Sequence, residues 1–475
     1  MKILVAGINY APDLIGIAKY TTEMCDFLRK KGHDVRVVTA PPYYPDWRIS
    51  KPYSGFFYSS EMLNDIKVIR CPLYVPKSPR ALFRILHHLS FAIASAPVLI
   101  AQALKFRPDI ILSVAPSLLG TPAAIVAGKL TGAVTWLHIQ DFEVDAAFGM
   151  KFLSGNRLRR LALSFESRLL RAFDSVSAIS GKMVDMLRDK GVPPSRFVEF
   201  RNWVDVATID ATIADGAPDV MTSLPPIGAT TTALYAGNMG AKQGLEVLAD
   251  VARKLAVTRP DIRFVFCGSG AMKDRLMQST KGLPNVIFLD LQPDSAFRKL
   301  LVSTDIHLLP QCLEIQDLAL PSKLGGMLAS GRPIIAMADD RTQLASELRD
   351  VSIVVPPANV DVMASALTML ADDPAQRRQL GMKGLQLARQ RWNREDVLSE
   401  FESRLQEFLA RRSNAAMNSK QGSDASDGVV DEVADSRGHW RLLSNSFTAR
   451  SRRGQMPPGQ SNGGSAPESA LKRVV

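Results

Sequence analysis

The chain has 475 residues, of which 46% are hydrophobic and 22% are charged. This length is too great for one ordinary core and suits two domains of roughly 150 to 200 residues, and the overall composition excludes fibrous and wholly disordered proteins. The net charge is +11, and the segment from Ser413 onward holds eight Lys/Arg and six Asp/Glu, which leaves +9 on the rest. A basic body suits nucleic acid, an anionic membrane or a phosphorylated substrate, and charge alone does not choose among them.

The N-terminus and the cysteines exclude two special classes. Residues 1–7 lack the long apolar stretch and the cleavage site of a secretory signal peptide, so we expect a cytoplasmic protein. Cys25, Cys71, Cys267 and Cys312 are far apart and form no CxxC pair, which argues against a zinc site or a disulfide framework.

Short apolar runs alternate with helical stretches through the first half, which indicates βαβ units and a parallel sheet. The predicted strands are residues 2–7, 34–39, 66–71, 109–114, 134–139, 175–179 and 197–201. The rhythm stops near Asn202, and a stretch rich in Ala, Thr, Asp and Pro follows. This stretch predicts a linker between two α/β domains.

The alternation then restarts and predicts a second sheet. Its strands are residues 233–236, 263–267, 286–289, 306–309, 333–337 and 353–355, followed by a helical region with breaks at Pro374 and near Trp392. From Ser413 the chain is rich in Ser, Gly, Asp and Pro, so we expect disorder there. The predicted division is 1–205, first domain; 206–231, linker; 232–392, second domain; 393–412, C-terminal helix; 413–475, disordered tail.

Residues 85–104 carry no formal charge and are long enough to span a bilayer. We expect a helix that does not span, because the segment leads directly into a predicted strand and contains His87, His88, Ser90, Ser95, Pro97 and Gln102. It is either a core helix or a helix whose first part lies against anionic lipid, flanked by Lys77, Arg80 and Arg84.

The run from Asn9 to Tyr20 follows the first strand and opens the first helix. Gly16 would let the backbone approach a ligand there, and free N–H groups at a helix start favour phosphate, although an ordinary turn is the alternative. The run lacks GxGxxG, which argues against a dinucleotide oxidoreductase.

Several spaced motifs together resemble the family 4 retaining glycosyltransferases over about residues 1 to 410. They are Tyr-x-Pro-x-x-x-Gly from Tyr10, Lys-Gly-His-x-Val-x-Val from Lys31, Asn202-Trp203-Val204-Asp205, residues 305–310 and residues 329–336. The resemblance implies the GT-B fold, with two facing Rossmann-like domains and a central cleft. It implies an N-terminal acceptor domain, a C-terminal nucleotide-sugar domain and retaining chemistry with neither metal nor other cofactor. It also implies no nucleic acid partner.

Transfer from a nucleotide-diphosphate sugar builds negative charge on the departing phosphate, which requires hydrogen-bond donors and cations. The loop after the first strand of the second domain offers Asn238, Gly240 and Lys242, with backbone N–H groups exposed by its glycines. Most members of the family have Gly-Arg at the start of this loop and Lys before its last glycine, where this chain has Asn238 and Gln243. Lys242 is therefore either a phosphate ligand or a solvated surface lysine.

A second departure from the family concerns its pair of glutamates, whose places are taken by Leu318 and Gly326. Glu314 or Asp317 could replace the ribose-binding carboxylate, and Lys323 could add charge near the phosphate. The family's loops that meet the nucleotide correspond here to strand ends that carry Gly268 and Gln292.

On the acceptor side, His138 near the end of a strand matches the family histidine that helps to hold the donor sugar. The alternative is a histidine that only caps the sheet. Asp141 is the next candidate, for contacts with sugar hydroxyls or local proton handling, within an acidic run that includes Glu143 and Asp145.

The resemblance implies transfer of a sugar onto a lipid-linked saccharide in exopolysaccharide assembly. The expected location is cytoplasmic and peripheral, at the inner face of the cell membrane. One alternative is an epimerase or phosphorylase on the same architecture, which the Pro321-Ser322-Lys323 and Asn202-Trp203-Val204-Asp205 runs disfavour. Another is a non-catalytic nucleotide-sugar-binding protein, motivated by the missing arginine and glutamates.

Overall fold

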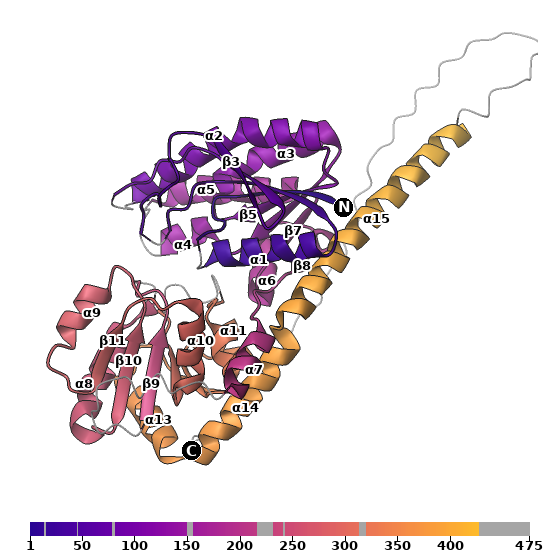
Figure 1. Ribbon diagram of the computed structural model, residues 1–475. Coiled ribbons are helices and arrows are strands. Elements are labelled where there is room, and N and C mark those ends of the chain that lie inside the picture. Colours follow the sequence, from indigo (N-terminus) through magenta and orange to yellow (C-terminus); the bar gives the residue numbers. More distant parts are fainter. Residues whose placement is uncertain are drawn as a thin grey trace, which may run out of the picture. The chain divides into compact units, whose positions relative to one another are not determined.

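The computed structural model describes residues 1–13, 16–44, 46–77, 81–149, 155–215, 231–240, 243–312 and 320–426. Two sheets with flanking helices lie within one compact unit, Met1–Ala415 (Figure 1). This arrangement confirms the prediction of two Rossmann-like domains.

The first sheet has eight strands in the order β3-β4-β2-β1-β5-β6-β7-β8. Its neighbours pair in parallel except for β3, which is antiparallel to β4 and was not predicted, because its alternating side chains are polar or exposed. The strands are β1 (Lys2–Gly7), β2 (Asp34–Thr39), β3 (Ser59–Leu63), β4 (Ile66–Arg70), β5 (Ile110–Ala115), β6 (Val134–Ile139), β7 (Ser175–Ala178) and β8 (Phe197–Glu199).

Helices cover both faces of this sheet. One face carries α2 (Ala81–Phe106), α3 (Thr121–Thr131), α5 (Asn156–Ala172) and α6 (Gly181–Asp189), and the other carries α1 (Ile17–Lys30). Shorter elements are η1 (Leu118–Gly120), α4 (Glu143–Gly149) and η2 (Pro194–Arg196). The chain leaves β1 toward one edge and continues from β5 toward the other, and the carboxyl ends at such a reversal point are where open α/β sheets bind ligands.

Helix α2 is the one described helix that is long and apolar enough to cross a membrane by length and composition. Its inner side chains Phe91, Leu99 and Phe106 are buried in the core of the first domain. The helix therefore stabilises the sheet through one face, while much of its remaining surface is exposed.

All strands of the second sheet are parallel, in the order β11-β10-β9-β12-β13-β14. Successive strands are added toward one edge from β9 to β11 and toward the other edge from β12 to β14, so the reversal point lies between β9 and β12. Its strands are β9 (Thr231–Ala236), β10 (Ile262–Cys267), β11 (Val286–Leu289), β12 (Ile306–Leu309), β13 (Ile334–Met337) and β14 (Ile353–Val355). Its helices are α8 (Glu246–Thr258), α9 (Lys273–Ser279), α10 (Asp294–Ser303), α11 (Leu324–Ala329), α12 (Gln343–Leu348), α13 (Val360–Asp372) and α14 (Pro374–Arg391).

The predicted linker begins with a packed helix, α7 (Val206–Ala214). The Asp205 carboxylate caps it by accepting from the Thr208 N–H at 3.1 Å, and Val206 and Ile209 are buried against the second domain. The capping role of Asp205 and the helical spacing that follows it were not predicted. Residues 216–230 of the predicted linker lie outside the described residues.

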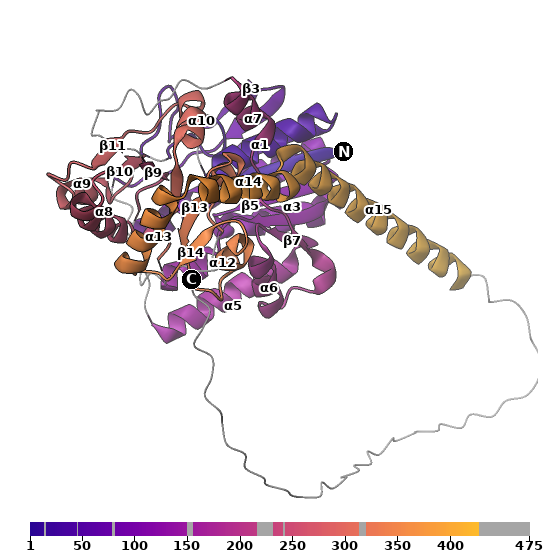
Figure 2. The ribbon, with the colours of Figure 1, turned by 90° about the horizontal axis from the view of Figure 1, so that it is seen from below.

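The C-terminal helix α15 (Arg394–Ser426) returns to the first domain, and Figure 2 shows α14 leading into it. Val204 N–H donates to the Trp392 carbonyl at 2.8 Å, and Arg394 N–H donates back to the Val204 carbonyl at 3.0 Å. The Phe401 ring stacks on Phe200 with centroids 3.8 Å apart. The helix ends later than the predicted residue 412, since no proline interrupts residues 413–426.

Phe401→Ala should destabilise the first domain although the residue is distant in sequence. Its side chain is buried among strand residues of the first sheet, and removing such a ring costs about 3 to 5 kcal/mol. Chemical unfolding would measure the loss, with the exposed Val257→Ala as control. An equal small change in both variants would contradict the packing of α15 on this core.

Candidate functional site

The loops after β9 and β10 meet at the reversal point of the second sheet. A Cβ on Gly268 would lie 2.1 Å from the Gly237 carbonyl oxygen, so only glycine permits this approach, which its φ of 139° also requires. A Cβ on Gly270 would lie 2.6 Å from Asn238 Oδ1. The structure therefore brings together three predicted donor-binding residues, Asn238, Gly240 and Gly268.

Lys323 reaches the same place from the start of α11. Its Nζ donates to Gln243 Oε1 at 2.9 Å and lies 4.1 Å from the centroid of the Tyr235 ring. A Cβ on Gly237 would lie 3.6 Å from the Lys323 Cδ. Burial lowers the pKa of Lys323 to about 7. Since the partners given by the described residues are a neutral amide and a ring, this ammonium is suited to an anionic ligand.

Two further glutamines follow strands at this edge. Gln292, which was predicted, follows β11 and donates from Nε2 to the Asp290 carbonyl at 2.9 Å. Gln311, which was not predicted, follows β12, and its buried Oε1 has no partner within the described chain. Neutral amides such as Gln243 and Gln311 carry no motif, and their position after a strand was the only available signal.

Four residues considered for the donor site lie outside the described residues. They are Lys242, Glu314, Asp317 and Leu318. Their predicted roles at the donor stay predictions.

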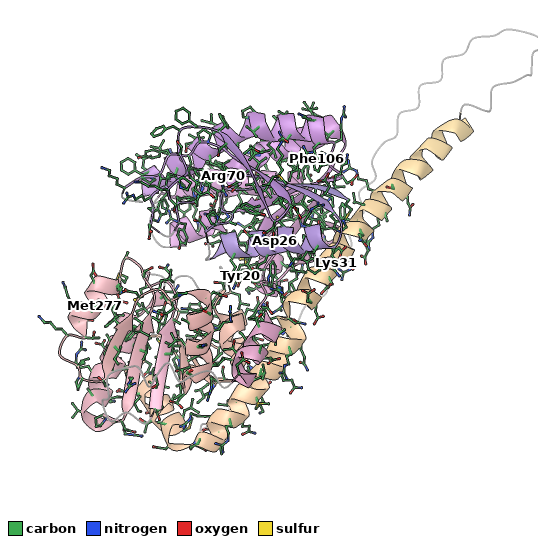
Figure 3. All side chains as sticks on the ribbon, in the orientation of Figure 1. Tyr20, Asp26, Lys31, Arg70, Phe106 and Met277 are labelled. Atoms are coloured by element: carbon green, nitrogen blue, oxygen red, sulfur yellow. The ribbon has the colours of Figure 1, made fainter. Side chains whose placement is uncertain are left out.

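Gly16 immediately precedes α1 with φ at 63°, and a Cβ there would have no neighbour within 4 Å. One turn later α1 carries Tyr20 (Figure 3). The Tyr20 hydroxyl donates to the carbonyl of Ser322, the residue before Lys323, at 3.1 Å. The beginning of α1 therefore approaches the donor-side loop.

His138 is buried within the first domain, near the end of β6. Its Nδ1 lies 3.0 Å from Ser177 Oγ, and the Gln140 amide donates to its Nε2 at 2.9 Å. Burial lowers the pKa of His138 to about 3, so the ring is neutral near pH 7. Because both ring nitrogens have protein partners, a sugar can reach Nε2 only after Gln140 moves. Sequence reasoning missed Gln140.

The acidic run beyond β6 divides into different roles. The Glu143 carboxylate accepts from the Ser117 and Leu118 N–H groups at 2.8 and 3.3 Å, and burial raises its pKa. Asp145 binds Lys190 at 2.7 Å. Asp141 lies two residues beyond the end of β6 and is partly exposed, which keeps it as the candidate for sugar contacts.

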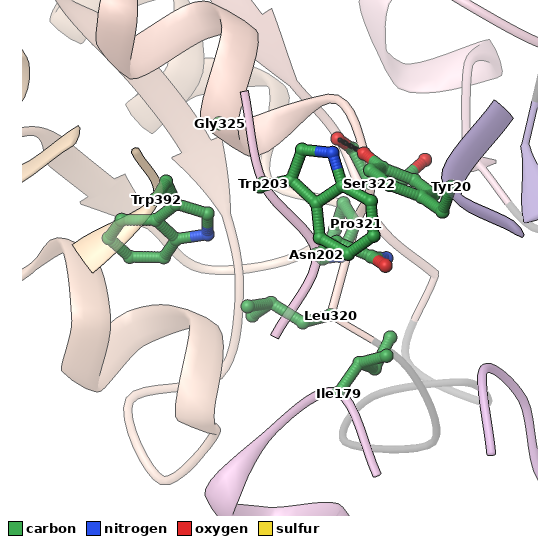
Figure 4. Close-up of a pocket in the computed structure, with 9 residues that line it drawn as sticks. All are labelled: Tyr20, Ile179, Asn202, Trp203, Leu320, Pro321, Ser322, Gly325 and Trp392. Atoms are coloured by element: carbon green, nitrogen blue, oxygen red, sulfur yellow. Dashed lines mark hydrogen bonds between the residues drawn. The ribbon is translucent and has the colours of Figure 1, made fainter. Parts of the chain in front are cut away.

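A small pocket of about 10 Å³, room for roughly one water molecule, lies where the connecting segments meet (Figure 4). Its lining residues are Tyr20, Ile179, Asn202, Trp203, Leu320, Pro321, Ser322, Gly325 and Trp392, none of which is charged. The Trp203 indole donates to Glu23 at 2.6 Å and packs edge-on against Tyr20. These walls do not suit a diphosphate, which places the better anion site at Lys323. Among the described residues, no group of three His, Cys, Asp or Glu side chains is arranged for a metal.

Two family descriptions match the chain. Residues 16–203 match "Glycosyl transferase 4-like domain" and residues 230–373 match "Glycosyl transferases group 1". The chain is 40% identical over 376 residues to the putative colanic acid biosynthesis glycosyl transferase WcaI of Escherichia coli strain K12, covering 77% of this chain and 91% of that protein. It is 21% identical to the GDP-mannose-dependent alpha-mannosyltransferase of Mycolicibacterium smegmatis, covering 77% and 89% respectively.

Solved structures share the fold at low identity. Sucrose-phosphate synthase from Thermosynechococcus elongatus superposes with a TM-score of 0.66 at 16% identity, covering 86% of this chain and 99% of that one. HepE from Anabaena, solved in complex with UDP, gives 0.59 at 12% identity, covering 86% and 100%. These likenesses support the same two-domain architecture.

Proposed function

The chain belongs to family 4 of the glycosyltransferases, and on this premise we propose that it moves a sugar from a nucleotide-diphosphate sugar to a lipid-linked saccharide. The proposed reaction retains the anomeric configuration and serves assembly of a colanic-acid-type exopolysaccharide. The likeness to WcaI over most of both chains supports this pathway.

The observation that carries the donor proposal is the ammonium of Lys323 at the reversal point of the second sheet. It lies beside Gly237, whose loop meets the Gly268 loop at backbone distance. A diphosphate placed here would meet a cation and backbone groups while its leaving oxygen gains charge. Asn238, Gly240, Gln292 and Lys242 complete the proposed donor site.

The acceptor saccharide is assigned to the first domain. Its reversal point lies at the carboxyl ends of β1 and β5, beside the loop that carries Asp141. Gly16, which was predicted to bind the donor, ends the loop after β1, immediately before α1. His138 lies in β6, which pairs with β5, and Gln140 follows that strand. Asp141 is the proposed contact to sugar hydroxyls, and His138 is the proposed contact near the reacting carbon.

A panel of nucleotide sugars tests the proposal. A donor should raise the thermal unfolding temperature, because a ligand bound only by the folded state stabilises it, and the same donor should be turned over with a saccharide acceptor. Stabilisation without transfer would favour the non-catalytic alternative. Conversion of the free nucleotide sugar without an acceptor would favour an epimerase.

We also propose peripheral contact with the inner face of the cell membrane through α2. Its outward residues Leu82, Leu86, Leu89 and Ile93 are exposed and recur at helical spacing. An adjoining loop adds the exposed Phe56, Phe57 and Tyr58, and the Tyr58 hydroxyl donates to the Ala94 carbonyl at 3.1 Å. Arg84 is exposed beside them, whereas Arg80 lies outside the described residues.

The α2 contact has its own test. Leu89→Asp combined with Ile93→Asp should reduce sedimentation with vesicles of neutral lipid. Unchanged sedimentation would remove α2 from the membrane contact.

A further inference from the structure

The helices α2, α3 and α5 lie together with α6 on one face of the first sheet. The charges of α2, α3 and α5 are one-sided, whereas α6 carries both signs. The helices α2, α3 and α5, of 26, 11 and 17 residues, contain a single acidic residue, Glu166. Glu166 is buried and binds Lys190 at 2.5 Å, so it contributes no negative charge to the surface. The basic residues of these three helices are Arg84, Lys105, Lys129, Arg157, Arg159, Arg160, Arg168 and Arg171.

Most of this positive charge lies on α5, which also exposes large apolar side chains to solvent. Leu158, Leu161 and Phe165 are 48%, 70% and 44% exposed, and their spacing of three and four residues places them on one side. Arg157 and Arg168 extend the same row at steps of four and three residues. This exposed apolar stripe adjoins the buried face of α5, since Phe165 and the buried Leu169 are four residues apart. Arg157 and Arg168 border it on the solvent side.

The arginines and the exposed apolar side chains of α5 together indicate which kind of partner would bind it. A nucleic acid or an acidic protein would satisfy the arginines, but neither accounts for three large exposed apolar side chains between them. An anionic bilayer accounts for both, because side chains such as Leu and Phe enter the boundary of the acyl chains while arginines meet the headgroups. The neighbouring α2 exposes apolar residues on the same layer but contributes only Arg84 and Lys105.

We propose that α5 is a second membrane-binding element, and that its arginines give the protein its preference for anionic lipid. In this division, α2 supplies apolar contact and α5 supplies the dependence on lipid charge. The inference deepens the proposed function at the membrane, on which it rests.

The test is flotation of the full chain with two kinds of vesicle, phosphatidylcholine alone and an equal mixture with phosphatidylglycerol. Arg157→Glu combined with Arg160→Glu should lower partitioning onto the mixed vesicles by about tenfold or more, since each cation near an anionic surface contributes appreciably. Partitioning onto phosphatidylcholine should change little. Leu161→Ser combined with Phe165→Ser should lower both.

The matched control is Arg404→Glu with Arg411→Glu, which makes the same change of net charge at exposed positions on α15. An equal loss in both double variants would overturn the proposal, because net charge alone would then explain it. Unchanged flotation of the α5 arginine variant would also overturn it. The same holds if that variant lost binding to a double-stranded RNA fragment while its binding to lipid stayed unchanged.

Sugar transfer to a water-soluble acceptor in the absence of vesicles separates this proposal from the proposed function. The α5 variant should retain wild-type transfer there. If the wild type transferred no sugar while its flotation still depended on α5, the proposed function would fail and the membrane element would stand.

Discussion

Lys323→Gln is expected to weaken donor binding and turnover together, with a combined loss of about 2 to 4 kcal/mol in kcat/KM, as for removal of a preorganised charge at a developing anion. The ammonium meets the diphosphate in the ground state and more strongly as the phosphate departs. Steady-state kinetics with varied donor concentration would measure this loss in kcat/KM. Lys281→Gln, an exposed lysine of the same domain, is the control.

The pH dependence sharpens this prediction. Burial lowers the pKa of Lys323 to about 7, whereas an adjacent diphosphate favours the charged form. Below pH 7 the ammonium is already present, and above it donor binding must take up a proton, so donor affinity should fall as pH rises from about 7. The intact nucleotide sugar is the probe, because its diphosphate lacks a terminal phosphate that titrates there. In Lys323→Gln this slope should disappear.

Unaltered kinetics and an unaltered pH profile would remove Lys323 from the phosphate. The contact would then belong to Lys242 or to backbone N–H groups of the loops after β9 and β10. Lys242→Ala would distinguish these two cases.

His138→Ala is expected to lower turnover by about 100-fold while affinity for the free nucleoside diphosphate stays nearly unchanged. The side chain belongs to the first domain, so it affects orientation of the sugar rather than nucleotide binding. Gln140→Ala, which frees Nε2 of His138, should have a smaller effect if the imidazole itself meets the sugar. His138→Ala also removes the hydrogen bonds of the ring to Ser177 and Gln140, which destabilises the fold. The assays should therefore be run well below the unfolding temperature.

The opposite pattern would contradict this assignment. If nucleotide affinity collapsed while turnover at saturation stayed normal, His138 would not be at the sugar. If Gln140→Ala lost as much turnover as His138→Ala, the glutamine would be the contact and His138 would position it.

Buried strands and strand ends could be predicted because apolar runs mark every central strand of both sheets. The edge strand β3 could not, since its side chains are polar or exposed. The helix α7 was missed although its capping residue, Asp205, and the helical spacing after it are visible in the sequence. The return of α15 to the first domain is a long-range contact, through Phe401 and Phe200, that local periodicity does not encode.

The candidate site was predictable where backbone geometry demanded glycine, as at Gly268. The site was harder to predict where a neutral side chain contacts a functional residue. Gln243 and Gln140 are ordinary polar residues in sequence, and only the fold places them against Lys323 and His138. For Lys323 the sequence suggested a charge near phosphate, but its burial against Tyr235 follows from packing.

The central claim is retaining sugar transfer, and the anomeric configuration of the first product tests it most directly. The purified full chain would be incubated with the nucleotide sugar that stabilises it and with a saccharide acceptor, and the new glycosidic bond followed by proton NMR at early times. We predict a glycoside whose anomeric configuration matches that of the donor. An inverted glycoside, or a donor converted without any glycoside, would contradict the account.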